Sequence, residues 1–140
     1  MNMVNAVIDT NVFVSGLLSA YGNPAKIINA FKEKHFNLFY SAYILEEYRD
    51  VLFRDKLGLN SKDINDLLGE ILKIGFSVIP EISDITLPDE DDRIFYDTAK
   101  AVNAYLITGN VKHFPGDPLV ISPADFIESI LLTKQTQYNE

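Results

Sequence analysis

The chain has 140 residues, the length of one ordinary domain, and its composition of 47% hydrophobic and 23% charged residues is that of a globular protein. No apolar run is long enough to cross a membrane, and the first residues carry no signal-peptide pattern. The chain has no cysteine, which excludes disulfides and thiolate metal sites, and two histidines are too few for a multi-histidine zinc centre. These features predict a soluble, cytoplasmic protein.

The net charge is -8, from 20 acidic and 12 basic residues. A simple nucleic-acid-binding protein is usually basic, so the acidic excess requires another explanation. Part of it is concentrated in the run Asp89-Glu90-Asp91-Asp92. A magnesium ion bound there would cancel much of the local charge.

The hydrophobic pattern predicts alternating strands and helices. In chain order, the first expected elements are a strand at 3–8, a helix or loop at 11–19, a helix from Asn23-Pro24 and a strand at 36–40. Next come a helix that Ser41 caps, that runs to about Arg54 and that Gly58 terminates, and a helix from Asn60 to Gly75. The rest are a strand at 76–79, a linker at 80–88, a helix at 91–103, strands at 104–108 and 119–121, a helix from Ser122-Pro123, and a frayed tail at 135–140. This order predicts an α/β fold with a mainly parallel sheet and helices on both faces.

An acidic residue directly follows the first expected strand, in the sequence Asp9-Thr10-Asn11. Ligands of open parallel sheets bind beyond the carboxyl ends of the strands, so Asp9 is expected in that crevice. The alternative is that Asp9 only caps the next helix.

Glu47 is expected on the inward face of its helix, because it lies three residues after Ile44, whereas Glu46 is on a more solvated face. A carboxylate on a core-facing stripe is costly unless it is paired or binds a cation. Glu47 is therefore a candidate metal ligand. The alternatives are a bond to the backbone or an ion pair with Arg49 or Arg54.

Asp92 differs from the rest of the acidic run, since it extends the buried face of Phe95 and Ala99 by one turn. Residues 89–91 are expected to be solvated, and Asp97 is expected outside the buried face. If Asp92 lines the same crevice as the other two acids, three carboxylates converge. Ligand sets made only of oxygen select magnesium or manganese rather than zinc.

Thr108-Gly109-Asn110 follows the strand at 104–108, again at a carboxyl end. Thr108 is expected to bond a nearby carboxylate, Gly109 to permit a tight turn, and Asn110 to offer a neutral carbonyl oxygen.

Four segments in this order resemble the PIN-domain family of metal-dependent nucleases. They are Val7-Ile8-Asp9-Thr10-Asn11, Ser41 through Glu47-Tyr48 to Leu52, Asp89 to Asp92, and Leu106-Ile107-Thr108-Gly109-Asn110. The resemblance covers nearly the whole chain. It implies a three-layer α/β/α sandwich over residues 1–134 and a ribonuclease that uses Mg²⁺ or Mn²⁺. Small proteins of this kind resemble the toxins of bacterial and archaeal toxin–antitoxin pairs, so the resemblance also implies an antitoxin partner.

The resemblance places metal carboxylates at Asp9, Glu47 and Asp92, which are also the expected catalytic residues. Asp91 is a further candidate for the metal or for orienting the attacking water. The family often has an aspartate where this chain has Asn110, which bears on a second metal site and on catalytic strength.

Two groups of residues are candidates to contact the RNA substrate. Those beside the acidic site are Asn11, Thr108 and Asn110. Those that offer positive charge to the RNA backbone are Arg93, Lys100, Lys112 and His113, and the alternative for each of these is a solvated surface charge.

Three other functions compete with this one. A phosphatase of the haloacid dehalogenase type needs a second aspartate two residues after the first, where this chain has Asn11. A receiver-type phosphorylation domain needs paired acids that this sequence does not offer. A PIN-like fold without activity that binds protein or RNA is the serious alternative, and Asn110 keeps it open.

Four large apolar residues fall at expected helix ends and edges: Tyr21, Phe31, Phe53 and Leu57. A domain of this size need not bury them all, and exposed apolar patches mark interfaces. They predict a homodimer or a surface that an antitoxin covers; the alternative is that they fill the single core.

Overall fold

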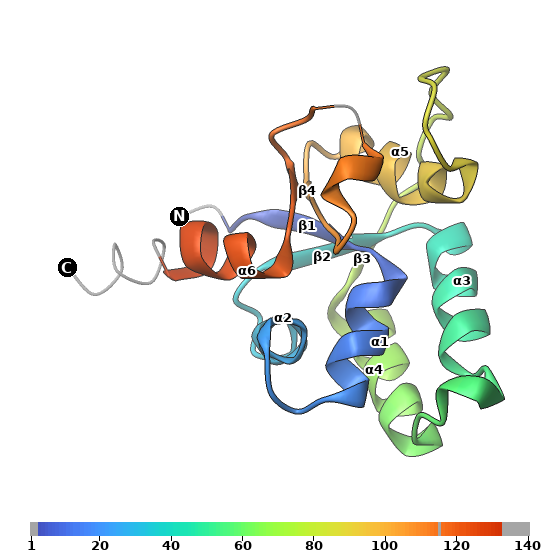
Figure 1. The fold of residues 1–140 in the computed structure, drawn as a ribbon, viewed down its shortest axis with the longest axis vertical. Coiled ribbons are helices and arrows are strands. Elements are labelled where there is room, and N and C mark those ends of the chain that lie inside the picture. The colour runs from blue at the N-terminus through green and yellow to red at the C-terminus, as the bar shows by residue number, and fades with distance from the viewer. Residues whose placement is uncertain (1–2, 115, 133–140) are drawn as a thin grey trace.

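A computed structural model describes residues 3–114 and 116–132 of the chain (Figure 1). Five strands form a parallel sheet in the order β3-β2-β1-β4-β5. They are β1 (Asn5–Ile8), β2 (Asn37–Tyr40), β3 (Phe76–Ser77), β4 (Tyr105–Ile107) and β5 (Val120–Ile121). The predicted α/β class and parallel sheet are confirmed. The predicted tail at 135–140 lies outside the described residues.

Helices cover both faces of this sheet. They are α1 (Thr10–Leu18), α2 (Asn23–Lys32), α3 (Ala42–Leu52), α4 (Ser61–Ile74), α5 (Arg93–Ala101) and α6 (Pro123–Asp125), the last continued by a π-helical segment, Phe126–Leu131. Helix α5 packs on β1, β2 and β4, and Figure 1 shows it on the opposite side of the sheet from α1 and α2. No helix in the described ranges is long and apolar enough to span a bilayer.

Helix starts follow the local sequence closely. The Ser41 hydroxyl accepts a hydrogen bond from the Ile44 amide, and the Asn60 side chain accepts from the amides of Lys62 and Asp63. Such caps satisfy amides that the first helical turn leaves unpaired. The predicted cap at Ser41 and the predicted helix start at Asn60 are therefore confirmed.

Other boundaries differ from the sequence-based expectation. Helix α3 ends at Leu52, and Gly58 instead ends a separate 3₁₀ turn, Asp55–Leu57, with a positive φ of 62°. The cap of α2 is Gly22, so Asn23 is already helical.

The core lies between the sheet and its helices, and it holds one of the four large apolar residues considered for an interface, as the core-filling alternative predicted. Phe31, near the end of α2, is buried because its ring packs 6.4 Å from that of Phe36, just before β2. Tyr21 and Phe53 are exposed, as expected, and Leu57 is half-buried.

Candidate active site

Strands β1 and β4 are neighbours at the centre of the sheet. Strands β2 and β3 lie on the β1 side of this pair, and β5 lies on the β4 side, so the strand order reverses between β1 and β4. The carboxyl end of such a pair is where open parallel sheets bind ligands. Two of the predicted site residues follow these strands directly, Asp9 after β1 and Thr108 after β4.

Asp9 is buried and held from β4. Its side chain accepts a hydrogen bond of 2.8 Å from the Thr108 hydroxyl, and its backbone amide donates to the Ile107 carbonyl. Asp9 occupies the N-cap position of α1, but its side chain makes no capping hydrogen bond. The expected bond between Thr108 and a carboxylate is confirmed. The backbone amides of Thr10 and Asn11, at the start of α1, also lower the pKa of Asp9, as expected of an acid at a helix N-terminus.

Glu47 reaches the same region from α3. It is half-buried, whereas Glu46 is exposed, as the helical periodicity predicted. Its Oε2 accepts a hydrogen bond from the hydroxyl of Thr10, the residue after Asp9. Arg54, an expected alternative partner of Glu47, pairs with Asp50 at 3.1 Å instead.

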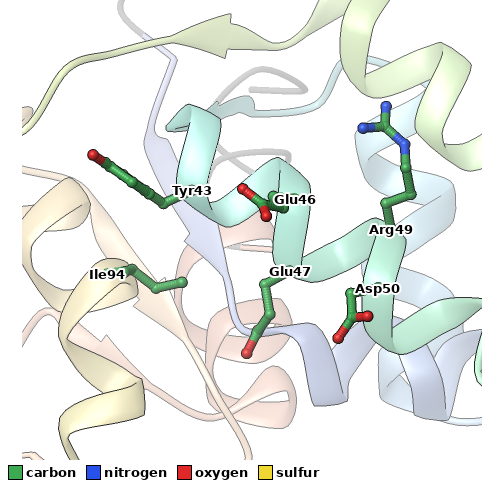
Figure 2. Close-up of a pocket in the computed structure, with 6 residues that line it drawn as sticks. All are labelled: Tyr43, Glu46, Glu47, Arg49, Asp50 and Ile94. Atoms are coloured by element: carbon green, nitrogen blue, oxygen red, sulfur yellow. The ribbon is translucent and has the colours of Figure 1, made fainter.

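A shallow groove of about 650 Å³ runs beside Glu47, between α3 and α5 (Figure 2). In Figure 2, Glu47 and Asp50 extend to one side of α3 and Arg49 to another, while Ile94 of α5 faces α3. Acidic side chains therefore line the groove together with apolar ones.

Asp92 stands at the start of α5, at the end of a 3₁₀ turn, Glu90–Asp92. Its side chain is 17% exposed, and its Oδ2 is buried with no hydrogen-bond partner among the described residues. The Nδ1 atom of His113 lies 3.4 Å from that oxygen. Residues 89–91 are exposed, as predicted.

The pKa values of the three carboxyl groups are all raised. Burial is the main cause of the raised pKa of Asp9, and the hydrogen bond from Thr108 opposes it. Burial also raises the pKa of Glu47, and repulsion from Asp9 and Asp91 raises it further. For Asp92 the causes of the raised pKa are burial, then repulsion from Asp9. The three groups thus share one partly dehydrated region in which negative charge is unfavourable.

Within residues 3–114 and 116–132, no three acidic or histidine side chains are close enough to form a ready-made metal site. The donor set still suits a hard divalent cation, because it consists of carboxylate oxygens, one of them buried and without a hydrogen-bond partner. Raised pKa values have the same implication, since a bound cation would compensate the charge that burial disfavours.

Asp97 corrects a sequence-based expectation. It was predicted to lie outside the buried face of α5 but is only 5% exposed. Ser83, in the linker before α5, donates to both Asp97 carboxylate oxygens, from its amide at 3.0 Å and from its hydroxyl at 2.6 Å. The reason is tertiary: the linker folds back over α5 and supplies the partners that a buried carboxylate needs.

The candidate RNA contacts are placed in two different ways. Asn11, Asn110 and Lys112 are exposed, and the backbone N–H of Asn110 donates to the Thr108 hydroxyl at 3.1 Å. Arg93 and Lys100 are already engaged. Arg93 bonds Glu90 and the linker carbonyls of Ser83 and Ile85, and Lys100 pairs with Asp117 at 2.8 Å.

Gly109 was expected to permit a tight turn. Its φ is not among the positive ones, and a Cβ there would meet nothing within 4 Å. The turn therefore places no demand for glycine at this position.

Two residues of the site were not singled out from the sequence. Thr10 bonds Glu47, and the hydroxyl of the fully buried Tyr48 donates to the carbonyl of Ile8, the residue before Asp9. Burial and the nearby charges of Asp9 and Glu47 raise the pKa of Tyr48 well above its ordinary value, so its hydroxyl stays a donor. A tyrosine within an apolar helix stripe was the available signal, since a buried hydroxyl requires a partner.

Comparisons with known proteins agree with this architecture. The sequence model of the PIN domain family matches residues 5–112. The uncharacterized protein MJ1680 of Methanocaldococcus jannaschii is 31% identical over 110 residues, which are 76% of this chain and 71% of that protein.

Two solved structures share the fold. One is VapBC2 from Rickettsia felis bound to a DNA fragment from its promoter, with a TM-score of 0.56 and 18% identity, covering 85% of this chain and 97% of the matched chain. The other is PAE2754 from Pyrobaculum aerophilum, with a TM-score of 0.53 and 15% identity, covering 95% of this chain and 90% of that one. The family match and the shared fold lead to one conclusion: this chain belongs to the PIN domain family, whose members are generally nucleases.

Proposed function

We propose that the protein is an endoribonuclease that depends on Mg²⁺ or Mn²⁺ and acts in the cytoplasm as the toxin of a toxin–antitoxin pair. The observation that carries the catalytic part is the group of three carboxyl residues, Asp9, Glu47 and Asp92: burial raises the pKa of each, and repulsion from Asp9 raises those of Glu47 and Asp92 further. Membership of a family of nucleases supports the reaction class.

The proposed ligands are Asp9, Glu47 and Asp92, and Asp91 is close enough to repel Glu47. A bound divalent ion lowers the pKa of a coordinated water and stabilises the charge of a phosphate. The chain's own residues prepare this chemistry: Thr108 holds Asp9, and Thr10 holds Glu47. Asp91, exposed at the rim, is the candidate to orient the attacking water.

Substrate binding is assigned to polar groups around the acids. Asn11 directly follows Thr10, Asn110 lies two residues after Thr108, and both are exposed. Lys112 is exposed in the 3₁₀ turn that begins after Asn110. Neutral amides suit a phosphate next to an acidic site, since their N–H groups donate hydrogen bonds without adding charge. Because Arg93 and Lys100 already hold protein partners, we give them a smaller part in binding RNA.

Cleavage of a circular RNA tests the proposal, since only an endonuclease opens a circle. We expect linear products with Mn²⁺ or Mg²⁺, none with excess chelator, and none from circular DNA of the same sequence. If the protein binds the RNA or a protein partner but leaves the RNA intact with every divalent ion, the result would favour the inactive binding module.

The proposed antitoxin rests on two observations. A structure with the same fold is a VapBC2 complex. Apolar side chains beside the site are also exposed, Ile79 by 96%, Ile82 by 83% and Tyr43 by 68%, and they line a groove of about 440 Å³ next to Ile94. We propose that an antitoxin or a second copy of the chain covers them; a monomer by sedimentation at micromolar concentration would contradict the homodimer.

Replacing Asn110 with aspartate tests the metal stoichiometry. The neutral amide keeps repulsion among the acids low and also limits attraction for a second cation. We therefore expect one weak metal site in the absence of RNA, and Asn110→Asp should tighten Mn²⁺ binding in a calorimetric titration. If Asn110→Asp leaves the affinity unchanged while Asp9→Asn removes it, Asn110 lies outside the metal shell and only shapes the turn.

A further inference from the structure

Two adjacent residues of α3 bond to the two residues that flank Asp9. The Oε2 atom of Glu47 accepts from the hydroxyl of Thr10, which follows Asp9. The hydroxyl of Tyr48 donates to the carbonyl of Ile8, which precedes Asp9, at 2.5 Å. Helix α3 is thereby tied on both sides of Asp9, although 37 and 40 residues separate the bonded pairs in the chain.

The Tyr48 hydroxyl is not needed to fill space. The ring is fully buried, edge-on to Phe13 with 4.9 Å between centroids and 6.3 Å from Phe95, so a phenylalanine would pack in the same place. Its hydroxyl contributes a directional bond to Ile8. In the ladder between β1 and β2, Asn5 pairs with Asn37 and Ala6 pairs with Leu38. The Ile8 carbonyl therefore lies beyond the residues that this ladder aligns.

The Thr10 hydroxyl also makes a directional bond to a distant residue. Thr10 is 3% exposed in the first turn of α1, where a threonine hydroxyl ordinarily bonds the neighbouring backbone. Here it reaches across to α3 instead. A glutamate has three rotatable side-chain bonds, and fixing its carboxylate before a ligand arrives removes an entropic cost from binding.

We propose that Tyr48 and Thr10 are positioning residues: their bonds to Ile8 and Glu47 form a bracket that sets the Glu47 carboxylate against Asp9. Neither hydroxyl is a ligand in this proposal. The inference rests on the proposed metal-dependent nuclease and adds to it the groups that organise its carboxylates. Groups that orient metal ligands typically change metal affinity or activity roughly 10- to 100-fold when removed.

The test compares variants that remove one hydroxyl each with matched controls. Tyr48→Phe and Thr10→Val break the bracket, and Thr10→Ser keeps the hydroxyl. Tyr96→Phe removes a hydroxyl bonded to Asp117, and Thr98→Val removes one bonded to the Ile94 carbonyl. For each protein we would measure Mn²⁺ affinity by calorimetry without RNA, kcat and KM on RNA, and the thermal unfolding midpoint.

We expect Tyr48→Phe and Thr10→Val to weaken Mn²⁺ binding about tenfold and to lower kcat with little change in KM. Thr10→Ser should restore both. The two controls should lose stability but keep the wild-type affinity and kcat, which separates positioning from a general loss of stability.

Wild-type Mn²⁺ affinity in both Tyr48→Phe and Thr10→Val would overturn the bracket while leaving the nuclease proposal intact. If Tyr48→Phe does not fold, the pair Thr10→Val and Thr10→Ser decides, since equal affinities in that pair would also overturn it. A wild-type protein that neither binds Mn²⁺ nor cleaves RNA would instead refute the proposed function, and the bracket with it.

Discussion

Replacing Asp9 with asparagine is expected to abolish Mn²⁺ binding and RNA cleavage while making the metal-free protein more stable. Asparagine keeps an oxygen that accepts the bond from Thr108, so the local structure is retained. It removes a negative charge from a site where burial raises the pKa of Asp9 and where Asp9 in turn repels Glu47 and Asp92. The loss of cleavage should exceed about a hundredfold, and the gain in unfolding free energy should be on the order of 1 kcal/mol.

Asp97→Asn is the matched control, because Asp97 is as buried as Asp9 but bonds only structural partners in the linker. It should be less stable than wild type, since an amide cannot accept both bonds from Ser83, and it should still cleave RNA. Chemical unfolding in chelator and a cleavage assay measure the two effects. A destabilised Asp9→Asn protein would show instead that the Asp9 charge serves the fold.

The metal-free protein is expected to become more stable as the pH falls from neutral toward about 5, relative to the Asp9→Asn variant. Asp9, Glu47 and Asp92 have raised pKa values in the folded state, from ordinary values of 3.8, 4.5 and 3.8. Each group therefore contributes stability that is complete below its ordinary pKa and is lost as the pH rises through its raised value. The folded protein holds these protons more tightly than the unfolded chain does.

Other carboxyl groups act in the opposite sense. The pKa of Glu90 is lowered by its bond from Arg93. Burial is the largest single effect on Asp117 and raises its pKa, but the bonds from Lys100, the Leu119 amide and Tyr96 together lower it below its ordinary value. Stability from these two groups is lost as the pH falls through their lowered values. The difference between wild type and Asp9→Asn cancels their contribution and isolates the site.

Mn²⁺ should reverse the pH dependence at the site. A cation at a hundred times its Kd adds about 2.7 kcal/mol to the free energy of unfolding, and it binds the deprotonated carboxylates. Stabilisation by Mn²⁺ should therefore grow between about pH 5 and pH 7 in wild type and be absent in Asp9→Asn. Urea unfolding followed by circular dichroism, with Mn²⁺ or with chelator, measures this. Equal pH dependence of the two proteins in chelator would contradict the shared acidic site.

Features that depend on neighbouring residues were predictable from the sequence alone. Ser41 and Asn60 cap their helices because a side-chain oxygen reaches an amide two or three residues on. Glu47 faces inward because helical periodicity places it with Ile44. Asp9 and Thr108 meet because both directly follow strands of one parallel sheet, whose carboxyl ends lie at the same edge.

Features that depend on segments distant in the chain were decided by the tertiary structure. Asp97 is buried because Ser83 folds back over α5, and periodicity within α5 carries no information about the linker. The sequence by itself thus determined the fold class and which acids are candidates for the site. Only the packing of α3 onto the β1–α1 junction decided how Thr10 and Tyr48 hold that site together, because a hydrogen bond between residues 40 apart depends on how whole elements are placed.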